Sequence, residues 1–466
     1  MHTLPSSFRD PDGFLFSHEG RIYRQVNKRF SDAFDRFVDS GLYEALTSRG
    51  YLVSHDDLTD TDIARTDDCY RILAPEQLPY ISYPYEWSFS QLKDAAMLTL
   101  RVQTVALQYG FSLKDASAYN VQFHNGKPIF IDTLSFEPYT DGTPWVGYRQ
   151  FCQHFLAPLA LMAYLDADLG KLLVAYIDGV PLALASKLLP LRTRFNYALQ
   201  AHIHLHAKMQ SSYADASGND GTKATKKSSK LNAESLQAII ESLASAVRKL
   251  EWKPPDTEWG DYYAHTNYSD DAAQAKRDLV DSMLASIDQP LQVIHDLGAN
   301  TGEFSRIAAK HGGLVVSQDI DAVAVERNYR QLRESDPRNL LPLRQDLFSP
   351  APAIGWGNCE RDSFVQRAHC DAILALALVH HLAISNNTPL QMVAELFAGL
   401  GNWLVIEFVP KTDSQVKRLL QTREDVFPNY NEDGFEAAFG EYFSIEKKAA
   451  VPESERHLYL MRRKAL

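Results

Sequence analysis

The feature that most constrains the fold is a repeated alternation of apolar strand patterns and helical patterns in the C-terminal half. Apolar runs of strand length occur at 291–296, 314–319, 341–345, 371–377 and 402–408. Helical patterns begin near 302, 321 and 388, and two further strand-like runs follow at 442–451 and 456–464. This alternation predicts an α/β domain with a mainly parallel, doubly wound sheet that is closed by an antiparallel pair.

The first of these strands runs into a glycine-rich turn in the stretch VIHDLGANTGEFSR (293–306). Gly298 and Gly302 lack a Cβ, so the backbone can turn sharply there and approach a ligand closely. Asn300 stands where a third glycine is common, and asparagine is one of the few other residues that tolerate a positive φ. The helix that follows offers free N–H groups to an anionic group, although the motif alone is weak.

The next strands end in residues that suit a nucleoside ligand. Asp319 ends the second strand 21 residues after Gly298, near the offset at which an acidic residue accepts hydrogen bonds from a ribose diol. Asp346 ends the third strand, where it can take an adenine amino group. His380 and His381 follow the fourth strand, at the edge where ligands bind in such folds.

In this order and spacing, DLGANTG, QDID, QDL and DAILALALVHHL resemble the class I S-adenosylmethionine-dependent methyltransferases over about 291–464. The resemblance implies a Rossmann-like fold with S-adenosylmethionine as cofactor. It assigns the methionine part to Asp296, Gly298, Asn300 and Gly302, the ribose and adenine to Asp319 and Ile320, and the adenine edge to Asp346 and Leu347. A nicotinamide-dependent dehydrogenase is disfavoured because GANTG lacks the GxGxxG spacing, and a non-catalytic relative of the fold is a further alternative.

Methyl transfer asks little of side chains, because the methyl group is already activated on a sulfonium and alignment supplies much of the rate. An acceptor that carries a proton benefits from a base, for which His380, His381 and Glu407 are candidates. The alternative to a catalytic role is that one of the two histidines packs in the core and the other caps the following turn. The aromatic stretch DTEWGDYYAHTNY (256–268) either covers the cofactor or acceptor or packs at a domain junction.

The stretch LKDASAYNVQFHNGKPIFID (113–132) has a different character. Asp115 and Asn120 have the D-x-x-x-x-N spacing, the turn at 124–127 predicts a hairpin, and Asp132 ends the next strand. The stretch resembles the core of protein kinases and aminoglycoside phosphotransferases within an α+β domain. That resemblance implies that Asp115 orients an acceptor hydroxyl as the base, and that Asn120 and Asp132 bind Mg²⁺ with ATP.

This second resemblance has departures. Leu113 and Lys114 replace the usual histidine and arginine, Thr133 and Leu134 replace Phe-Gly, and no glycine-rich loop is found upstream. Lys28 is the one guess at a phosphate-binding lysine. Three interpretations stay open: a kinase-derived domain that binds or positions an acceptor, a working phosphotransferase, and chance. No metal site is assigned.

The polar segment 210–232, QSSYADASGNDGTKATKKSSKLN, predicts a linker or loop. It divides an accessory kinase-like domain (1–209) from a methyltransferase domain (233–466), whose first helix is predicted at 233–252. The four cysteines have no zinc-ligand spacing and fit a reducing cytoplasm. A net charge of −12 disfavours nucleic acid as a partner, and no apolar run is long enough to span a membrane.

The phrases YPYEWSFSQLKDAA, LKDASAYNVQF and FIDTLSFEPY resemble the N-terminal region of a bacterial group of long methyltransferases similar to a rhizobial nodulation protein. This resemblance spans most of the chain. We therefore expect a methyltransferase that acts on a small-molecule acceptor, with the N-terminal domain helping to present it. A bifunctional protein with an active ATP- and magnesium-dependent phosphotransferase domain is the alternative. The acceptor and the oligomeric state cannot be read from the sequence.

Overall fold

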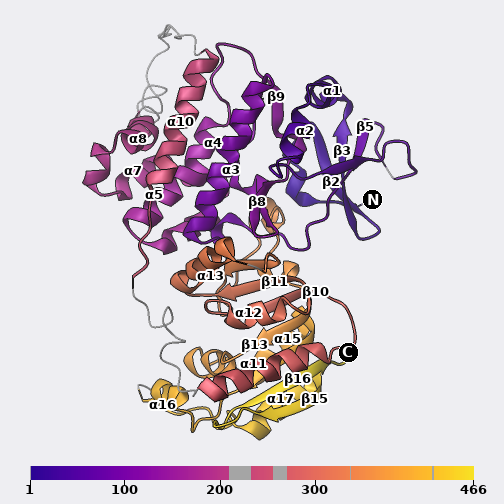
Figure 1. Cartoon of the computed structure of the whole chain (residues 1–466), viewed down its shortest axis with the longest axis vertical. Coiled ribbons are helices and arrows are strands. Elements are labelled where there is room, and N and C mark those ends of the chain that lie inside the picture. The colour runs from indigo at the N-terminus through magenta and orange to yellow at the C-terminus, as the bar shows by residue number, and fades with distance from the viewer. Residues whose placement is uncertain are drawn as a thin grey trace. The chain divides into compact units, whose positions relative to one another are not determined.

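The computed structural model describes residues 2–63, 65–208, 232–255, 270–335, 337–421 and 424–465, which belong to two compact units (Figure 1). The first unit comprises Met1–Leu78, Ser82–Lys253 and Ala353–Arg361. The second comprises Pro79–Ile81, Pro254–Pro352 and Asp362–Leu466. The predicted linker at 210–232 lies outside the described residues apart from Asn232, as does the aromatic stretch 256–268.

The first unit begins with a five-stranded antiparallel sheet in the order β1-β2-β3-β5-β4. Its strands are β1 (His2–Thr3), β2 (Gly13–His18), β3 (Arg21–Asn27), β4 (His55–Asp57) and β5 (Cys69–Pro75). A hairpin joins β2 to β3, where Glu19 and Gly20 both have positive φ, so the turn follows the twist of the strands. Helices α1 (Ser31–Asp39) and α2 (Leu42–Thr47) follow β3.

A long helix and four short strands follow this sheet. Helix α3 (Phe89–Gln108) begins at a capping box, in which the Ser88 N–H donates to Gln91 Oε1 (2.9 Å) and the Gln91 N–H donates to Ser88 Oγ (3.3 Å). Four short strands follow: β6 (Phe111–Leu113), β7 (Val121–His124), β8 (Lys127–Phe130) and β9 (Phe136–Pro138). β7 and β8 form the predicted hairpin, and β6 pairs with β9.

The rest of the first unit is helical. Its α-helices are α4 (Tyr148–Phe151), α5 (Ala157–Tyr164), α6 (Leu172–Ala175), α7 (Leu182–Leu188), α8 (Tyr197–Leu199) and α10 (Ala233–Lys249). α5 lies within the apolar run 155–165 and is mostly buried. Within the described ranges, no helix has both the length and the apolar character needed to cross a membrane.

Helix α10 forms where the sequence predicts it but belongs to the first unit, not to the second. Its apolar side chains Leu236, Ile240, Leu243 and Val247 are buried, and the helix packs on α3. The boundary between the units therefore follows Lys253. The helical pattern identified an apolar face but not the surface that covers it.

The second unit contains a seven-stranded sheet in the order β12-β11-β10-β13-β14-β16-β15. The strands are β10 (Leu291–Leu297), β11 (Gly312–Asp319), β12 (Leu340–Arg344), β13 (Cys370–Ala375), β14 (Gly401–Phe408), β15 (Phe443–Ala450) and β16 (His457–Arg463). The first five in spatial order are parallel, β16 runs antiparallel to β14, and β15 runs antiparallel to β16. This confirms the predicted Rossmann-like, doubly wound sheet.

The helices of the second unit are α11 (Asp270–Ala285), α12 (Glu303–Ala308), α13 (Ala322–Glu334), α14 (Phe364–Arg367), α15 (Leu390–Leu400), α16 (Ser414–Leu420) and α17 (Glu432–Tyr442). Strand order reverses between β10 and β13, since the chain leaves β10 toward β11 and returns to β13 on the other side. In open α/β sheets, ligands bind outside the carboxyl ends of the strands at such a point.

Two short segments lie in the unit formed mainly by the other half of the sequence. Tyr80 is buried in the second unit, where its ring centroid is 5.4 Å from that of His295 and its hydroxyl accepts a hydrogen bond from Arg367 Nη1 (3.0 Å). Arg361 lies in the first unit, with its guanidinium carbon 4.6 Å from the ring centroid of Tyr119. The domain boundaries predicted from the sequence put Tyr80 in the first domain and Arg361 in the second, which is the reverse of their observed places.

Candidate functional site

The glycine turn after β10 adopts the conformation predicted for it. Gly298, Asn300 and Gly302 have φ of 77°, 52° and 81°, all in the left-handed region. A Cβ on Gly298 would lie 3.2 Å from Leu378 Cδ1, and one on Gly302 would lie 2.5 Å from Asn328 Nδ2. Asparagine therefore replaces glycine at the one position of the three where a side chain is accommodated.

The carboxylates at the ends of β10, β11 and β12 are held by local hydrogen bonds. Asp296 is buried and its Oδ2 accepts from Ser305 Oγ (2.6 Å). Asp319 accepts from the N–H of Asn300 (2.8 Å) through Oδ2 and from that of Asp321 (2.8 Å) through Oδ1. These contacts fix each carboxylate in position. The hydrogen bond from Asn300 to Asp319 also joins the glycine turn to β11.

Asp346 stands at the third strand end and is fixed in a similar way. Its Oδ1 accepts from the N–H groups of Phe348 (2.9 Å) and Ser349 (3.2 Å). Two apolar side chains beside the strand ends, Ile320 and Phe348, are exposed. They provide the flat, apolar surface that a purine base prefers. Phe348 was missed from the sequence, and its position two residues after Asp346 is the signal that would have found it.

Burial changes the proton affinity of two of these carboxylates. Desolvation raises the pKa of Asp296 to about 7, against the hydrogen bond from Ser305. Desolvation also raises the pKa of Asp319 to about 6, against the backbone hydrogen bonds that it accepts. Strongly raised carboxylate pKa values beside a cavity are typical of a functional site.

The predicted cofactor residues meet at one cavity of about 370 Å³. Seven of the eight line it, namely Asp296, Gly298, Asn300, Asp319, Ile320, Asp346 and Leu347. Gly302 does not, because its Cα faces the amide of Asn328. The cavity therefore lies at the carboxyl ends of β10, β11 and β12, beside the point where strand order reverses.

The candidate bases are placed differently around this cavity. His381 lines it, whereas His380 is buried behind it with a ring centroid 4.1 Å from that of His381. Desolvation lowers the pKa of His380 well below its usual value, so this ring is neutral. His381 is thus the histidine that an acceptor in the cavity would reach.

Glu407 is fully buried and is not among the residues that line the cavity. Its Oε2 accepts from Lys276 Nζ (2.7 Å) and from the N–H of Ala377 (2.7 Å). Its Oε1 lies 3.5 Å from Arg456 Nη1, and Arg456 Nε pairs with Asp413 (2.8 Å). Glu407 therefore joins a buried network of charges that fixes the wall of the cavity.

Lys276 lines the cavity and was missed by sequence reasoning. It is buried on α11 and lies 5.1 Å from the ring centroid of Phe304. Desolvation lowers its pKa, and Glu407 opposes that shift. The signal was present, because Lys276 falls at the four-residue spacing of the buried Ala272, Val280 and Leu284.

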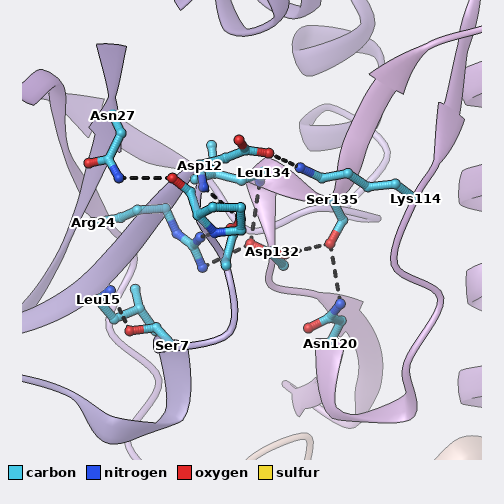
Figure 2. Close-up of polar contacts among 12 residues, drawn as sticks. Ser7, Asp12, Leu15, Arg24, Asn27, Lys114, Asn120, Asp132, Leu134 and Ser135 are labelled. Carbon is cyan, nitrogen blue, oxygen red and sulfur yellow. Dashed lines mark hydrogen bonds and ion pairs between the residues drawn. The ribbon is translucent and has the colours of Figure 1, made fainter. Parts of the chain in front are cut away.

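In the first unit, Asn120 and Asp132 of the phosphotransferase-like motif lie in one polar network (Figure 2), and the Asp115 side chain is hydrogen-bonded to that of Asn120. Asp132 Oδ1 accepts from the N–H of Leu134 (3.3 Å), and its Oδ2 accepts from the Ser135 hydroxyl. Asn120 Nδ2 donates to the same hydroxyl (3.2 Å). Burial, and secondarily the charge of Asp132, raises the pKa of Asp115.

Cations already pair with the carboxylates of this network. Figure 2 shows Arg24 of β3 reaching Asp132, with 2.8 Å between Nη2 and Oδ1, and Lys114 reaching Asp12. Arg29 pairs with Asp12 as well (3.0 Å). Lys28 is exposed and donates to a backbone carbonyl, so it does not take part in this network. In the described residues, no group of three or more His, Cys, Asp or Glu side chains is arranged to hold a metal.

Comparison with known proteins decides the family. The nodulation protein NoeA of Rhizobium meliloti (strain 1021) is 36% identical over 469 residues, which cover 99% of this chain and 96% of NoeA. The chain belongs to the NoeA family. The expected likeness to a nodulation protein over most of the chain is thus confirmed. No protein-family model matches the chain.

Solved structures similar to this NoeA-family chain include three methyltransferases. The N-methyltransferase NodS of Bradyrhizobium japonicum WM9 is 11% identical and covers 42% of this chain and 99% of its own (TM-score 0.31). The magnesium protoporphyrin IX methyltransferase of Synechocystis PCC 6803 is 18% identical and covers 43% of this chain and 91% of its own (TM-score 0.31). The bifunctional kinase-methyltransferase WbdD is 15% identical and covers 42% of this chain and 40% of its own (TM-score 0.28).

The fold assignment rests on the strand order itself. A parallel sheet with a central β10, a switch to β13 and an antiparallel β16 inserted beside β14 is the arrangement of class I methyltransferases. Together with the glycine turn and the carboxylates at the strand ends, this order gives the second unit of the NoeA-family chain the fold of the class I methyltransferases.

Proposed function

We propose that this NoeA-family chain transfers the methyl group of S-adenosylmethionine to a small-molecule acceptor at the cavity of the second unit. One observation carries the proposal: the glycine turn, Asp319 and Asp346 line a single cavity. The residues fit the cofactor in kind. Gly298 has no Cβ, and a Cβ at this position would lie only 3.2 Å from Leu378 Cδ1. The carboxylates at the strand ends are acceptors that match the donor groups of a ribose and an adenine.

In this proposal Asp319 would hold the ribose hydroxyls, Asp346 the adenine edge, and the turn at Gly298 the methionine part. The cofactor, when bound, supplies a methyl group already activated by its sulfonium. The chain supplies alignment, which α11 and the residues around His381 provide by closing the remaining wall. His381 is the candidate base for an acceptor that carries a proton, and Glu407 acts by positioning Lys276.

Thermal unfolding in the presence of single ligands tests this function. S-Adenosylhomocysteine at 100 times its dissociation constant should stabilise the chain by about 2.7 kcal/mol. ATP with Mg²⁺ is the matched second ligand, because it shares the adenosine but lacks the amino-acid part. Stabilisation by S-adenosylhomocysteine alone supports the methyltransferase. No response to S-adenosylhomocysteine, at concentrations up to millimolar, would contradict it.

The raised carboxylate pKa values predict a pH dependence of cofactor binding. Ribose hydroxyls donate to the ionised form of Asp319, so bound ligand lowers its pKa below the value of about 6 in the ligand-free chain. Binding below that value must release a proton. The affinity for S-adenosylhomocysteine should therefore weaken as pH falls below about 6, by up to about tenfold per pH unit, and level off above about 7.

Isothermal titration calorimetry across this pH range measures the effect. Asp319→Asn is the matched variant, since it keeps hydrogen-bond acceptors but does not titrate, and its affinity should depend less on pH. An affinity for the natural chain that stays constant or strengthens at low pH would show that the Asp319 carboxylate does not contact the ligand.

The first unit, in our proposal, helps to present the acceptor. Supporting this role, its phosphotransferase-like residues are assembled but Asp132 is already paired with Arg24. The donor types suit Mg²⁺, yet a fixed guanidinium beside the carboxylate does not suit a divalent cation. The alternative, ATP- and magnesium-dependent phosphotransfer, is supported by the grouping of Asp115, Asn120 and Asp132, and the ATP–Mg²⁺ measurement above tests it.

The pairing of Arg24 predicts a loss of stability when it is removed. Both side chains are largely buried, so Arg24→Met should leave Asp132 without its cation and lower the free energy of unfolding by about 3 kcal/mol. Denaturant unfolding measures it. Arg21→Met, on the same strand but exposed, is the control and should have little effect. Equal losses in the two variants would refute the pairing.

We also propose a bacterial cytoplasmic location. The four cysteines, Cys69, Cys152, Cys359 and Cys370, are free thiols in the structure, which is the state that a reducing compartment maintains. The bacterial source of the NoeA relative supports the bacterial assignment.

A further inference from the structure

A second surface, outside the methyltransferase cavity, displays large apolar side chains to solvent. It is formed by the end of α7, the 3₁₀ helix Leu191–Phe195 and the start of α8, at the left edge of the first unit in Figure 1. Phe195 is 91% exposed, Tyr197 84% and Leu191 72%. Isolated exposed apolar residues are ordinary, but three within seven residues of one turn mark an interaction site.

This display is held from the inside rather than by a loose loop. Thr193 is fully buried and its hydroxyl donates to the carbonyl of Pro190 (2.6 Å), while His204 Nε2 lies 3.0 Å from Thr193 Oγ1. Asn196 Oδ1 then accepts from two N–H groups at the start of α8. Because these hydrogen bonds hold the Thr193 side chain inside the fold, the residues on either side of it in the 3₁₀ helix point outward.

The surface is also locally basic. Lys187, Arg192 and Arg194 are exposed beside the apolar residues, and no Asp or Glu occurs from Gly179 to Lys208. The whole chain carries a net charge of −12, so this cluster opposes the overall charge. Its occupant must therefore accept apolar side chains and carry negative charge.

We propose that this basic aromatic surface (Lys187, Leu191, Arg192, Arg194, Phe195 and Tyr197) docks the chain on an anionic phospholipid bilayer. Phe195 and Leu191 enter the boundary between head groups and acyl chains, and Tyr197 lies at the head-group level, where an aromatic ring with a polar tip is favoured. Arg192 and Arg194 bind lipid phosphates. The contact is peripheral and reversible, and it is separate from methyl transfer.

Co-sedimentation of the full chain with vesicles tests the proposal. Vesicles containing phosphatidylglycerol should bind at least about tenfold more tightly than vesicles of phosphatidylcholine alone, and added salt should weaken the binding. The triple variant Leu191→Ser/Phe195→Ser/Tyr197→Ser and the double variant Arg192→Glu/Arg194→Glu should each lose this binding by tenfold or more. Both should keep the circular dichroism spectrum and the denaturant unfolding curve of the natural chain, which shows that the first unit is folded.

Matched control variants replace the same kinds of side chain at exposed positions outside the proposed surface. Met392→Ser removes an exposed apolar side chain, and Arg101→Glu/Lys127→Glu reverses two exposed cations of the first unit; both should bind vesicles like the natural chain. Absence of vesicle binding, equal binding to neutral vesicles, or unchanged binding by both surface variants would overturn the proposal. A fall in self-association of the triple variant, with no vesicle binding, would show instead that a second copy covers this surface.

Discussion

Replacing Asp319 by alanine should abolish measurable binding of S-adenosylhomocysteine. In the proposed complex this carboxylate accepts from two ribose hydroxyls, and each hydrogen bond to a charged group contributes about 1.5–3 kcal/mol. Loss of both corresponds to an affinity lower by roughly 100-fold or more. The variant also removes the link between Asp319 and the N–H of Asn300 (2.8 Å), so the glycine turn loses its support from β11. Calorimetric titration of natural and variant chains measures the change.

Asp371→Ala is the matched control for this prediction. Asp371 also accepts from two backbone N–H groups, those of Gln292 (2.7 Å) and Val293 (3.0 Å), but at the opposite end of the sheet from the cavity. Its loss should cost stability and leave the affinity for S-adenosylhomocysteine unchanged. Retained affinity in Asp319→Ala, or equal losses in the two variants, would mean that the cofactor site has been misplaced.

Replacing Lys276 by methionine should affect stability and catalysis together. The ammonium forms a buried ion pair with Glu407 at 2.7 Å, and breaking such a pair from one side costs about 3–5 kcal/mol because it leaves a buried charge. Lys276 also forms part of the cavity wall on α11. Acceptor methylation should therefore fall at least about tenfold, through misalignment, while affinity for S-adenosylhomocysteine changes little.

The double variant Lys276→Met/Glu407→Gln separates the two effects. Neutralising Glu407 removes the negative charge that Lys276 no longer balances, and Arg456 keeps its ion pair with Asp413, so most of the stability should return in denaturant unfolding, whereas the methylation rate should stay low. Recovery of both would show that Lys276 has only a structural role. No loss of stability in the single variant would show that the buried pair does not form.

The strands around the cavity could be predicted because each of them depends on local signals. The buried strands β10, β11, β13 and β14 are apolar runs separated by helical patterns, and the observed bounds agree with the predicted ones within a few residues. Asp319 and Asp346 were found because parallel strands bring their carboxyl ends to one edge of a sheet. The left-handed turn at Asn300 was predicted because asparagine tolerates a positive φ, and its observed φ confirms this prediction.

What the sequence did not predict depends on contacts between distant residues. Arg24 and Asp132 are more than a hundred residues apart, and nothing in either local pattern indicates their pairing. Tyr80 and Arg361 are single side chains whose burial partners come from elsewhere in the chain. The placement of α10 on α3 is of the same kind, since an amphipathic pattern specifies a buried face without naming its partner.

A crystal structure of the full chain with bound S-adenosylhomocysteine would locate the cofactor site. We expect the ribose hydroxyls to lie within hydrogen-bonding distance of Asp319, the adenine beside Asp346 and Leu347, and the amino-acid part against the turn at Gly298. A ligand bound anywhere else in the chain, with this cavity left to solvent, would contradict the assignment of the site.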